Sequence, residues 1–194
     1  ARAVARTTVC LSNKRQVSLA VASYANDWKQ VTPSGRCSAP GQGTRWWHEF
    51  FVPDDYAPTD YLSAEATEID CPEGQEDDAV FGSYDTVKHS EDERFRVFEQ
   101  DQSTGWLFRG IHLDSVPWPA DLMTYACAAK WNRAETNFSP GYPTFSATVA
   151  GPGGGWKALW TPHHQSTTAG LLADGHAETY GRDAMARLRN AWFP

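Results

Sequence analysis

The stretch ARAVARTTVCLSNKRQVSLAVASYANDWK, residues 1–29, decides the fold of this chain of 194 residues. It contains no Gly and no Pro, and its large apolar residues recur at the three- and four-residue steps of an amphipathic α-helix. The stripe consists of Cys10, Val17, Val21, Tyr24 and Trp28. The helix must end before Pro33-Ser34-Gly35. Its first two turns carry few large apolar residues, so we expect that end to project from the body.

The C-terminal part predicts a β-hairpin followed by a short helix. The segments AGLLA (169–173) and HAETY (176–180) flank Asp174-Gly175, and Asp-Gly is among the strongest short signals for a tight hairpin. The segment RDAMARLRNAW (182–192) then has the spacing of a short amphipathic helix.

Between these ends the sequence favours strands separated by loops. Strands are predicted at 46–52, 94–100, 105–113 and 142–150. Segment 122–131 fits a strand or a helix, and 33–45 and 73–93 are predicted as loops. One long helix followed by strands indicates an α+β domain with an antiparallel sheet. We expect a single domain over residues 1–194, with the helix in 1–30 and the sheet, loops and hairpin in 31–194.

Charge is unevenly spread along a chain whose net charge is −7. Residues 1–36 carry a net of +5, whereas residues 60–101 hold fourteen acidic and three basic residues, a net of −11. The basic residues of the helix are interpreted as its solvated face in preference to a membrane-binding patch. No basic patch interleaves with aromatic residues, so nucleic acid is not an expected partner.

Two sets of residues, at opposite ends of the chain, form a recognisable pattern. The N-terminal set is Cys10, Leu11, Asn13, Gln16, Tyr24, Ala25 and Asp27. The C-terminal set is a His, a nine-residue gap and Asp-Gly, which fall on His164, Asp174 and Gly175. Cys71-Pro72 lies between them. Together these positions resemble the prepilin-type family of bacterial type IV pilin-like and type II secretion pseudopilin-like proteins, over about a quarter of the chain.

The resemblance implies a pilin-like fold, with a long N-terminal helix packed on an antiparallel sheet. It also implies a structural subunit, not an enzyme, that assembles with copies of itself into a type IV pilus or type II secretion pseudopilus filament. Such a protein is exported to the bacterial cell envelope or into an extracellular filament. Family members carry a leader and about twenty apolar residues, enough to span a bilayer, so we expect a membrane anchor upstream of Ala1 in the parent protein.

The segment HHQSTTAGLLADGHAETY (163–180) gathers residues suited to a metal site, to catalysis or to a hairpin scaffold. The scaffold is favoured, because Asp174-Gly175 makes the turn and His164 is placed to hydrogen-bond a backbone group or Asp174 across the hairpin. No cofactor is expected except calcium, which some pseudopilins resembling this chain hold near the C-terminal loop. Asp174 is then the candidate metal ligand, because calcium prefers oxygen ligands. A second candidate calcium site is the carboxylate cluster Glu73, Glu76, Asp77 and Asp78.

No nucleophile signature of the G-x-S-x-G kind is present, and GPGGG (151–155) lacks the Lys-Ser/Thr of a phosphate loop. Nine Trp residues and the acidic loops motivate an alternative function, a secreted carbohydrate-binding or glycoside-hydrolysing domain. A third reading is a minor tip subunit that touches surfaces through Trp46, Trp47 and His48.

The four cysteines, Cys10, Cys37, Cys71 and Cys127, lack the spacing of a zinc site. Cys10 lies on the apolar stripe and is expected to be buried. The export that the resemblance implies favours disulfide formation. Two pairings, Cys71–Cys127 and Cys37–Cys71, remain as unranked alternatives.

Overall fold

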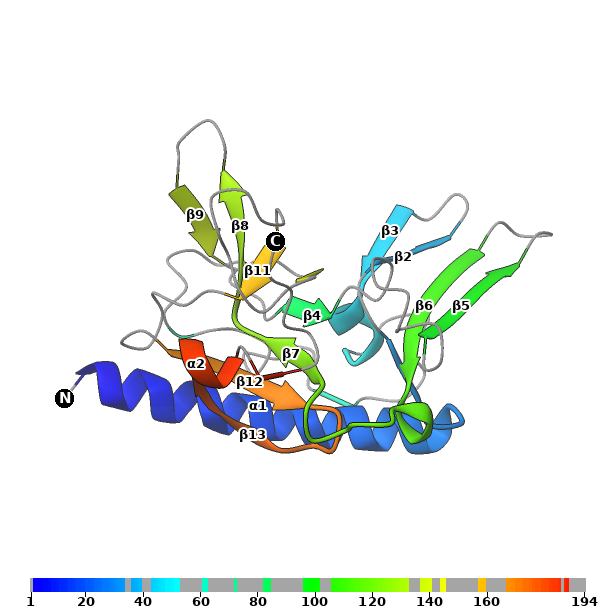
Figure 1. Cartoon of the computed structure of the whole chain (residues 1–194). Coiled ribbons are helices and arrows are strands. Elements are labelled where there is room, and N and C mark those ends of the chain that lie inside the picture. The colour runs from blue at the N-terminus through cyan, green and yellow to red at the C-terminus, as the bar shows by residue number, and fades with distance from the viewer. Residues whose placement is uncertain are drawn as a thin grey trace.

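The computed structural model describes residues 2–33, 36–39, 43–52, 61–62, 72, 82–84, 96–101, 106–132, 137–140, 144–145, 157–159, 167–185 and 187–188. Helix α1 (Arg2–Asp27) runs along one side of the molecule and the strands lie on the other (Figure 1). The protein is therefore α+β, with the predicted pilin-like arrangement of a long N-terminal helix, antiparallel sheets, a C-terminal hairpin and a short helix.

The described strands form three sheets. The first contains β1 (Val31–Pro33), β2 (Arg36–Ala39), β3 (Gly43–Trp46), β5 (Arg96–Asp101) and β6 (Trp106–His112), and β6 pairs with β1, β2 and β5. The second has the order β10 (Thr144–Phe145), β4 (Gly82–Tyr84), β7 (Met123–Ala126), β12 (Thr167–Leu172) and β13 (Ala177–Gly181). The third has the order β11 (Lys157–Leu159), β8 (Ala128–Asn132) and β9 (Asn137–Pro140). Among these described pairs only β4–β10 is parallel.

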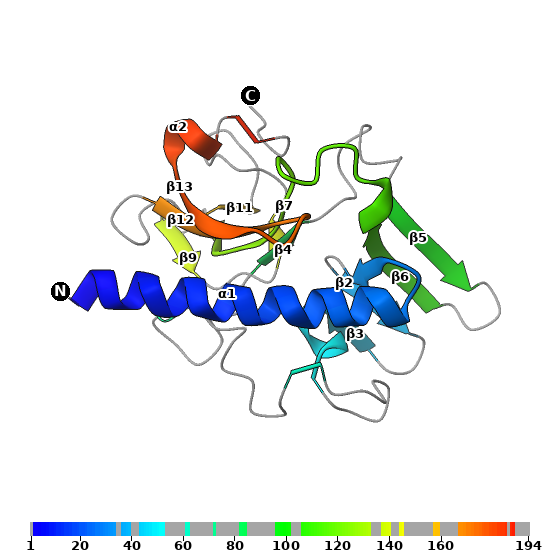
Figure 2. The same cartoon turned by 90° about the horizontal axis from the view of Figure 1, so that it is seen from below.

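Strand β7 of the second sheet is buried on both faces. Tyr125 and, just after the strand, Cys127 belong to the core under α1, whereas Met123 and Ala126 belong to a second core. Strict alternation would place Met123 with Tyr125, but the pairing of β7 with β12 shifts register at these two residues. The second core also contains Met185, at the end of α2 (Arg182–Met185), and Leu188. Helix α1 packs against β12 and β13 and reaches β1 near its C-terminal end (Figure 2).

The predicted stripe of α1 is buried in its central part. Cys10, Val17, Val21 and Tyr24 are buried, and the first buried residue of the helix is Cys10. The prediction was wrong for Trp28, which is 52% exposed. The helix ends at Asp27, and Lys29 and Gln30 adopt positive φ, so the chain turns away and the Trp28 ring stacks on Tyr24 instead.

The interpretation of the basic residues as a solvated face was wrong at Lys14. Its side chain is 0% exposed, one turn after Cys10 and one before Val17, on the face that α1 turns toward the sheets. The four-carbon stem of Lys packs like an apolar side chain. Arg2, Arg6 and Arg15 are exposed, as predicted.

The middle of the chain differs from the predictions in three places. Segment 73–93 was predicted as a loop but includes β4, which pairs with β7. Segment 33–45 was predicted as loop but includes β2 and most of β3, which pair with each other. Segment 46–52 was predicted as a strand, yet only Trp46 belongs to one, and η1 (Trp47–Phe50) follows. Trp47 and Phe51 are four residues apart and share one side of the helical turn, and both are 0% exposed; a strand would also have turned Glu49 toward that side.

The remaining predictions were closer. Strands 94–100 and 105–113 are confirmed as β5 and β6, which pair as a hairpin. Segment 122–131 forms strands β7 and β8, and η4 (Leu113–Ser115) precedes it. The hairpin β12–β13 is confirmed. Of the predicted helix 182–192, α2 covers Arg182–Met185, and residues 186 and 189–192 lie outside the described residues. Only Thr144-Phe145 of the predicted strand 142–150 is described as strand. Within the described residues, no helix combines the length and apolarity that crossing a membrane requires.

Candidate functional site

The Asp174-Gly175 turn is fixed by hydrogen bonds on both of its sides. The Oδ1 atom of Asp174 accepts a hydrogen bond from the backbone N–H of His176 at 2.9 Å, a geometry that Asp favours in turns. Gly175 has φ of 86°, which is strained for residues with a Cβ. The Ser18 hydroxyl of α1 donates to the Gly175 carbonyl at 3.0 Å. The turn therefore docks the hairpin on α1.

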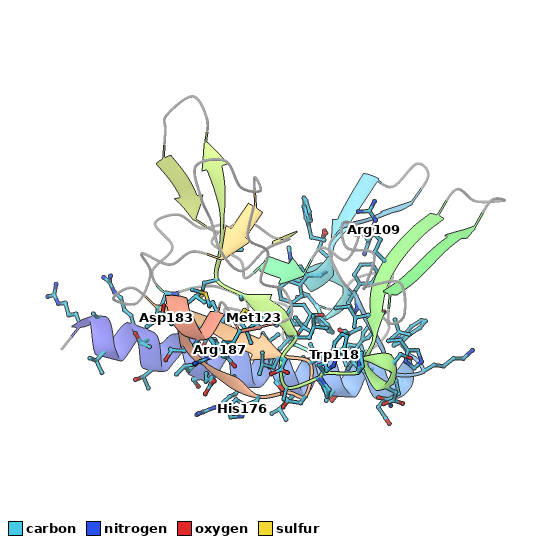
Figure 3. All side chains as sticks on the ribbon, viewed as in Figure 1. Arg109, Trp118, Met123, His176, Asp183 and Arg187 are labelled. Carbon is cyan, nitrogen blue, oxygen red and sulfur yellow. The ribbon has the colours of Figure 1, made fainter. Side chains whose placement is uncertain are left out.

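The structure places Asp174 in this turn but leaves calcium binding a prediction. In the described part of the chain, no three or more His, Cys, Asp or Glu side chains are grouped so as to hold a metal ion. His163, His164 and the carboxylate cluster at 73–78 lie outside the described residues. Beside the turn, His176 Nε2 lies 3.5 Å from Glu178 Oε2, with both side chains exposed. His176 lies at the outer edge of the hairpin (Figure 3).

Among the residues that the structure describes, two titratable groups have shifted pKa values, and in both cases burial is the main cause. Burial raises the pKa of the Tyr180 phenol, and the carboxylates of Glu178 and Asp174 raise it further. Burial lowers the pKa of His48, against the opposing effect of Glu49. Tyr180 therefore stays protonated near pH 7, and the surroundings of His48 favour its neutral form.

The proposed tip surface of Trp46, Trp47 and His48 is not an exposed patch. Trp47 is 0% exposed, and its ring lies 4.5 Å from that of Tyr125 between centroids. Trp46 and His48 are partly buried. Trp47 thus belongs to the core, which overturns its assignment as a surface contact.

A cluster of aromatic rings joins α1 to this core. Phe51 and Tyr61 both pack edge-on against Tyr24 of α1, at 5.3 Å between centroids. Four Trp side chains are described, at positions 28, 46, 47 and 118, and among them only Trp28 is mainly exposed. A row of exposed Trp rings, which would have favoured a carbohydrate-binding surface, is not found among these four.

The outward face of α1 is the other candidate surface. From Arg2 to Val9 no residue is buried, and this end of the helix extends past the strands (Figures 1 and 2). Val4 is 62% exposed, Val9 48% and, further along, Leu19 71%. The two arginines of these turns, Arg2 and Arg6, are exposed beside the valines. The projecting turns therefore present apolar and cationic groups to solvent.

The predicted disulfide residues are only partly described. Cys37 lies in β2, Cys71 lies outside the described residues, and Cys127 follows β7. The sulfur of Cys127 faces that of Cys10, at a distance of 3.5 Å. Neither alternative pairing included Cys10, because no sequence signal links two residues so far apart in the chain.

Comparisons of the chain with models of protein families, with curated proteins and with solved structures give no match.

Proposed function

We propose that this chain is the globular region of a structural subunit that assembles with copies of itself into a filament of the type IV pilus or type II secretion pseudopilus kind. The observation that carries the proposal is the N-terminal part of α1. Residues 2–9 are helical although none of them is buried, and Val4 and Val9 are exposed. Because helices owe most of their stability to tertiary packing, two turns without a buried residue are expected to pack on another molecule.

The charge distribution supports a second copy of the chain as the packing partner. The projecting turns carry Arg2 and Arg6, while residues 60–101 carry a net charge of −11. A cationic helix end on one copy is complementary to an acidic segment on the next, and such complementarity fixes register and orientation between subunits. A head-to-tail contact between unlike surfaces generates an open helical filament when the rotation from one subunit to the next does not close a ring.

The motif resemblance supports the same reading. Asp174 and Gly175 of the C-terminal motif form the turn that docks on α1 through Ser18. The motif thus has a structural role, in keeping with a building block. Under this proposal the protein is exported, and its anchor is encoded upstream of Ala1; reading the gene upstream of that position tests the anchor.

The filament role is tested in the full-length protein in its own host. Surface filaments are sheared off, and the chain is located in them by immunoelectron microscopy. We expect Val9→Glu to abolish incorporation and Ala22→Glu, a matched acidic substitution at an exposed position of the same helix, to preserve it. Both purified variants should melt like the wild type. Absence of the wild-type chain from filaments, or normal incorporation of Val9→Glu, would contradict the proposal.

A further inference from the structure

Cys10 and Cys127 meet across the interface between α1 and the second sheet. Their sulfur atoms are 3.5 Å apart, and the side chains are 0% and 3% exposed, respectively. An S–S bond is about 2.05 Å long, so each sulfur needs to move by about 0.7 Å to form one. Side-chain rotation alone covers a distance of this size.

The backbone holds both residues in place for this reaction. Cys10 lies within the continuous helix α1. The N–H of Cys127 donates to the carbonyl of Ala169 at 3.2 Å, and its carbonyl accepts a hydrogen bond from the Thr168 hydroxyl at 3.3 Å. Both bonds join Cys127 to β12, which itself packs against α1. The two thiols are thus positioned by the fold and do not depend on a mobile loop to meet.

We infer that Cys10 and Cys127 form an intramolecular disulfide that fastens α1 to the sheet when the protein folds in an oxidising compartment. The bond follows from the contact itself and is independent of whether the protein forms filaments. It links positions 117 residues apart, and cross-links that close long loops restrict the unfolded chain most. It would hold the helix on the body while its N-terminal end is engaged elsewhere.

The chemistry is a thiol–disulfide exchange. The oxidant is a disulfide, supplied by a dithiol–disulfide oxidoreductase in the cell or by oxidised glutathione in the test tube. One cysteine thiolate attacks the oxidant disulfide, whose S–S bond breaks to release a first thiol and leave a mixed disulfide. The second cysteine thiolate then attacks the mixed disulfide, forms the Cys10–Cys127 bond and releases the second thiol of the oxidant. Overall, two thiols lose two electrons and two protons to the oxidant. Because both sulfurs are buried, exchange takes place during folding or local opening.

The peptide map of the chain makes the test direct. Each cysteine falls in a separate tryptic peptide, namely 7–14 for Cys10, 37–45 for Cys37, 46–88 for Cys71 and 110–130 for Cys127. The reduced protein is refolded with oxidised and reduced glutathione, alkylated in denaturant and digested without reduction. We expect peptide 7–14 linked to peptide 110–130. A link from 110–130 to 46–88 or to 37–45, or alkylation of both Cys10 and Cys127, would overturn the inference.

A second measurement isolates the pair. The variant Cys37→Ser/Cys71→Ser keeps Cys10 and Cys127 as its only cysteines, and adding Cys10→Ser gives a control that has a single thiol. Reducing the first variant should lower its Tm by about 5–15 °C, as expected for loss of a long-loop disulfide in a protein of this size. The control should show no shift. Equal Tm values of the oxidised and reduced first variant, or two alkylatable thiols after oxidative refolding, would refute the bond.

Discussion

Replacing Tyr125 with Phe removes one hydroxyl from the point where the first and second sheets meet. The Tyr125 hydroxyl donates to the carbonyl of Pro33 at 2.7 Å. Since its proton is used there, the Thr32 hydroxyl donates to the Tyr125 oxygen, also at 2.7 Å. Tyr125 and Thr32 are 1% and 0% exposed. Water therefore cannot readily replace the lost hydroxyl as a partner.

The expected magnitude follows from the two groups that lose a partner. A buried polar group left without a partner costs about 1–3 kcal/mol, so Tyr125→Phe should lower the free energy of unfolding by about 2–4 kcal/mol. Thr32→Val removes only one of the two hydrogen bonds and should cost about 1 kcal/mol. In the double variant the Thr32 hydroxyl is absent and cannot be left without a partner. The decrease in its free energy of unfolding should therefore be smaller than the sum of the two single-variant decreases by roughly 1 kcal/mol.

Urea unfolding of the wild type, both single variants and the double variant measures these values, provided that the m-value stays constant. Tyr61→Phe is the matched control. Its hydroxyl donates to Asp27 at 2.9 Å at an exposed site, and removing it should cost about 0.5 kcal/mol or less. A loss below about 0.5 kcal/mol for Tyr125→Phe, or additivity within about 0.3 kcal/mol in the double variant, would refute the reasoning.

Three further predictions concern the hairpin, the second core and the pH dependence. Gly175→Ala should lower the free energy of unfolding by about 1–2 kcal/mol in urea, because φ is 86° there. Asp174→Asn keeps the side-chain acceptor of the turn. If Asp174 binds calcium, EDTA lowers the Tm of the wild type and not of the Asn variant, and an unchanged Tm of the wild type would rule out a bound calcium ion. Gly170→Ala places a Cβ against the buried Met123 side chain and should cost about 1–3 kcal/mol, with partial rescue by Met123→Val; a neutral effect would contradict this packing. Burial lowers the pKa of His48 below 6.5, so the neutral folded form contributes stability that is complete well above pH 6.5 and is lost as the pH falls below it. His48→Gln should therefore flatten the rise in stability with pH in the region just below 6.5, and an unchanged slope would show that His48 is not its source.

The sequence was sufficient where a local pattern determines the structure. The long run without Gly or Pro predicted α1, and Asp174-Gly175 predicted the hairpin, because helix periodicity and turn chemistry act over a few residues. The end of α1 was harder to place. Lys29 and Gln30 adopt positive φ without the Gly that usually marks such a turn, so the apolar stripe seemed to continue to Trp28.

Features that depend on tertiary contacts could not be predicted from the sequence. Lys14 is counted as a solvated residue in any pattern of hydrophobicity, yet the packing of α1 buries it completely. Trp47 carried no signal that distinguished a core ring from a surface ring. The Cys10–Cys127 contact depends on the topology that brings α1 beside β12 and β7. The sequence predicted that the N-terminal end of α1 projects but not that its valines face solvent, because the exposure of a side chain depends on which face of the helix the sheets cover.

Site-specific photo-crosslinking from Val9 tests the filament account most directly. A photoreactive amino acid is placed at position 9 of the full-length protein in its host, at the exposed N-terminal part of α1, and intact cells are irradiated before the surface fraction is sheared off. The account predicts a ladder of covalent multimers made of this chain alone. Monomer only, or adducts exclusively with other proteins, would contradict it.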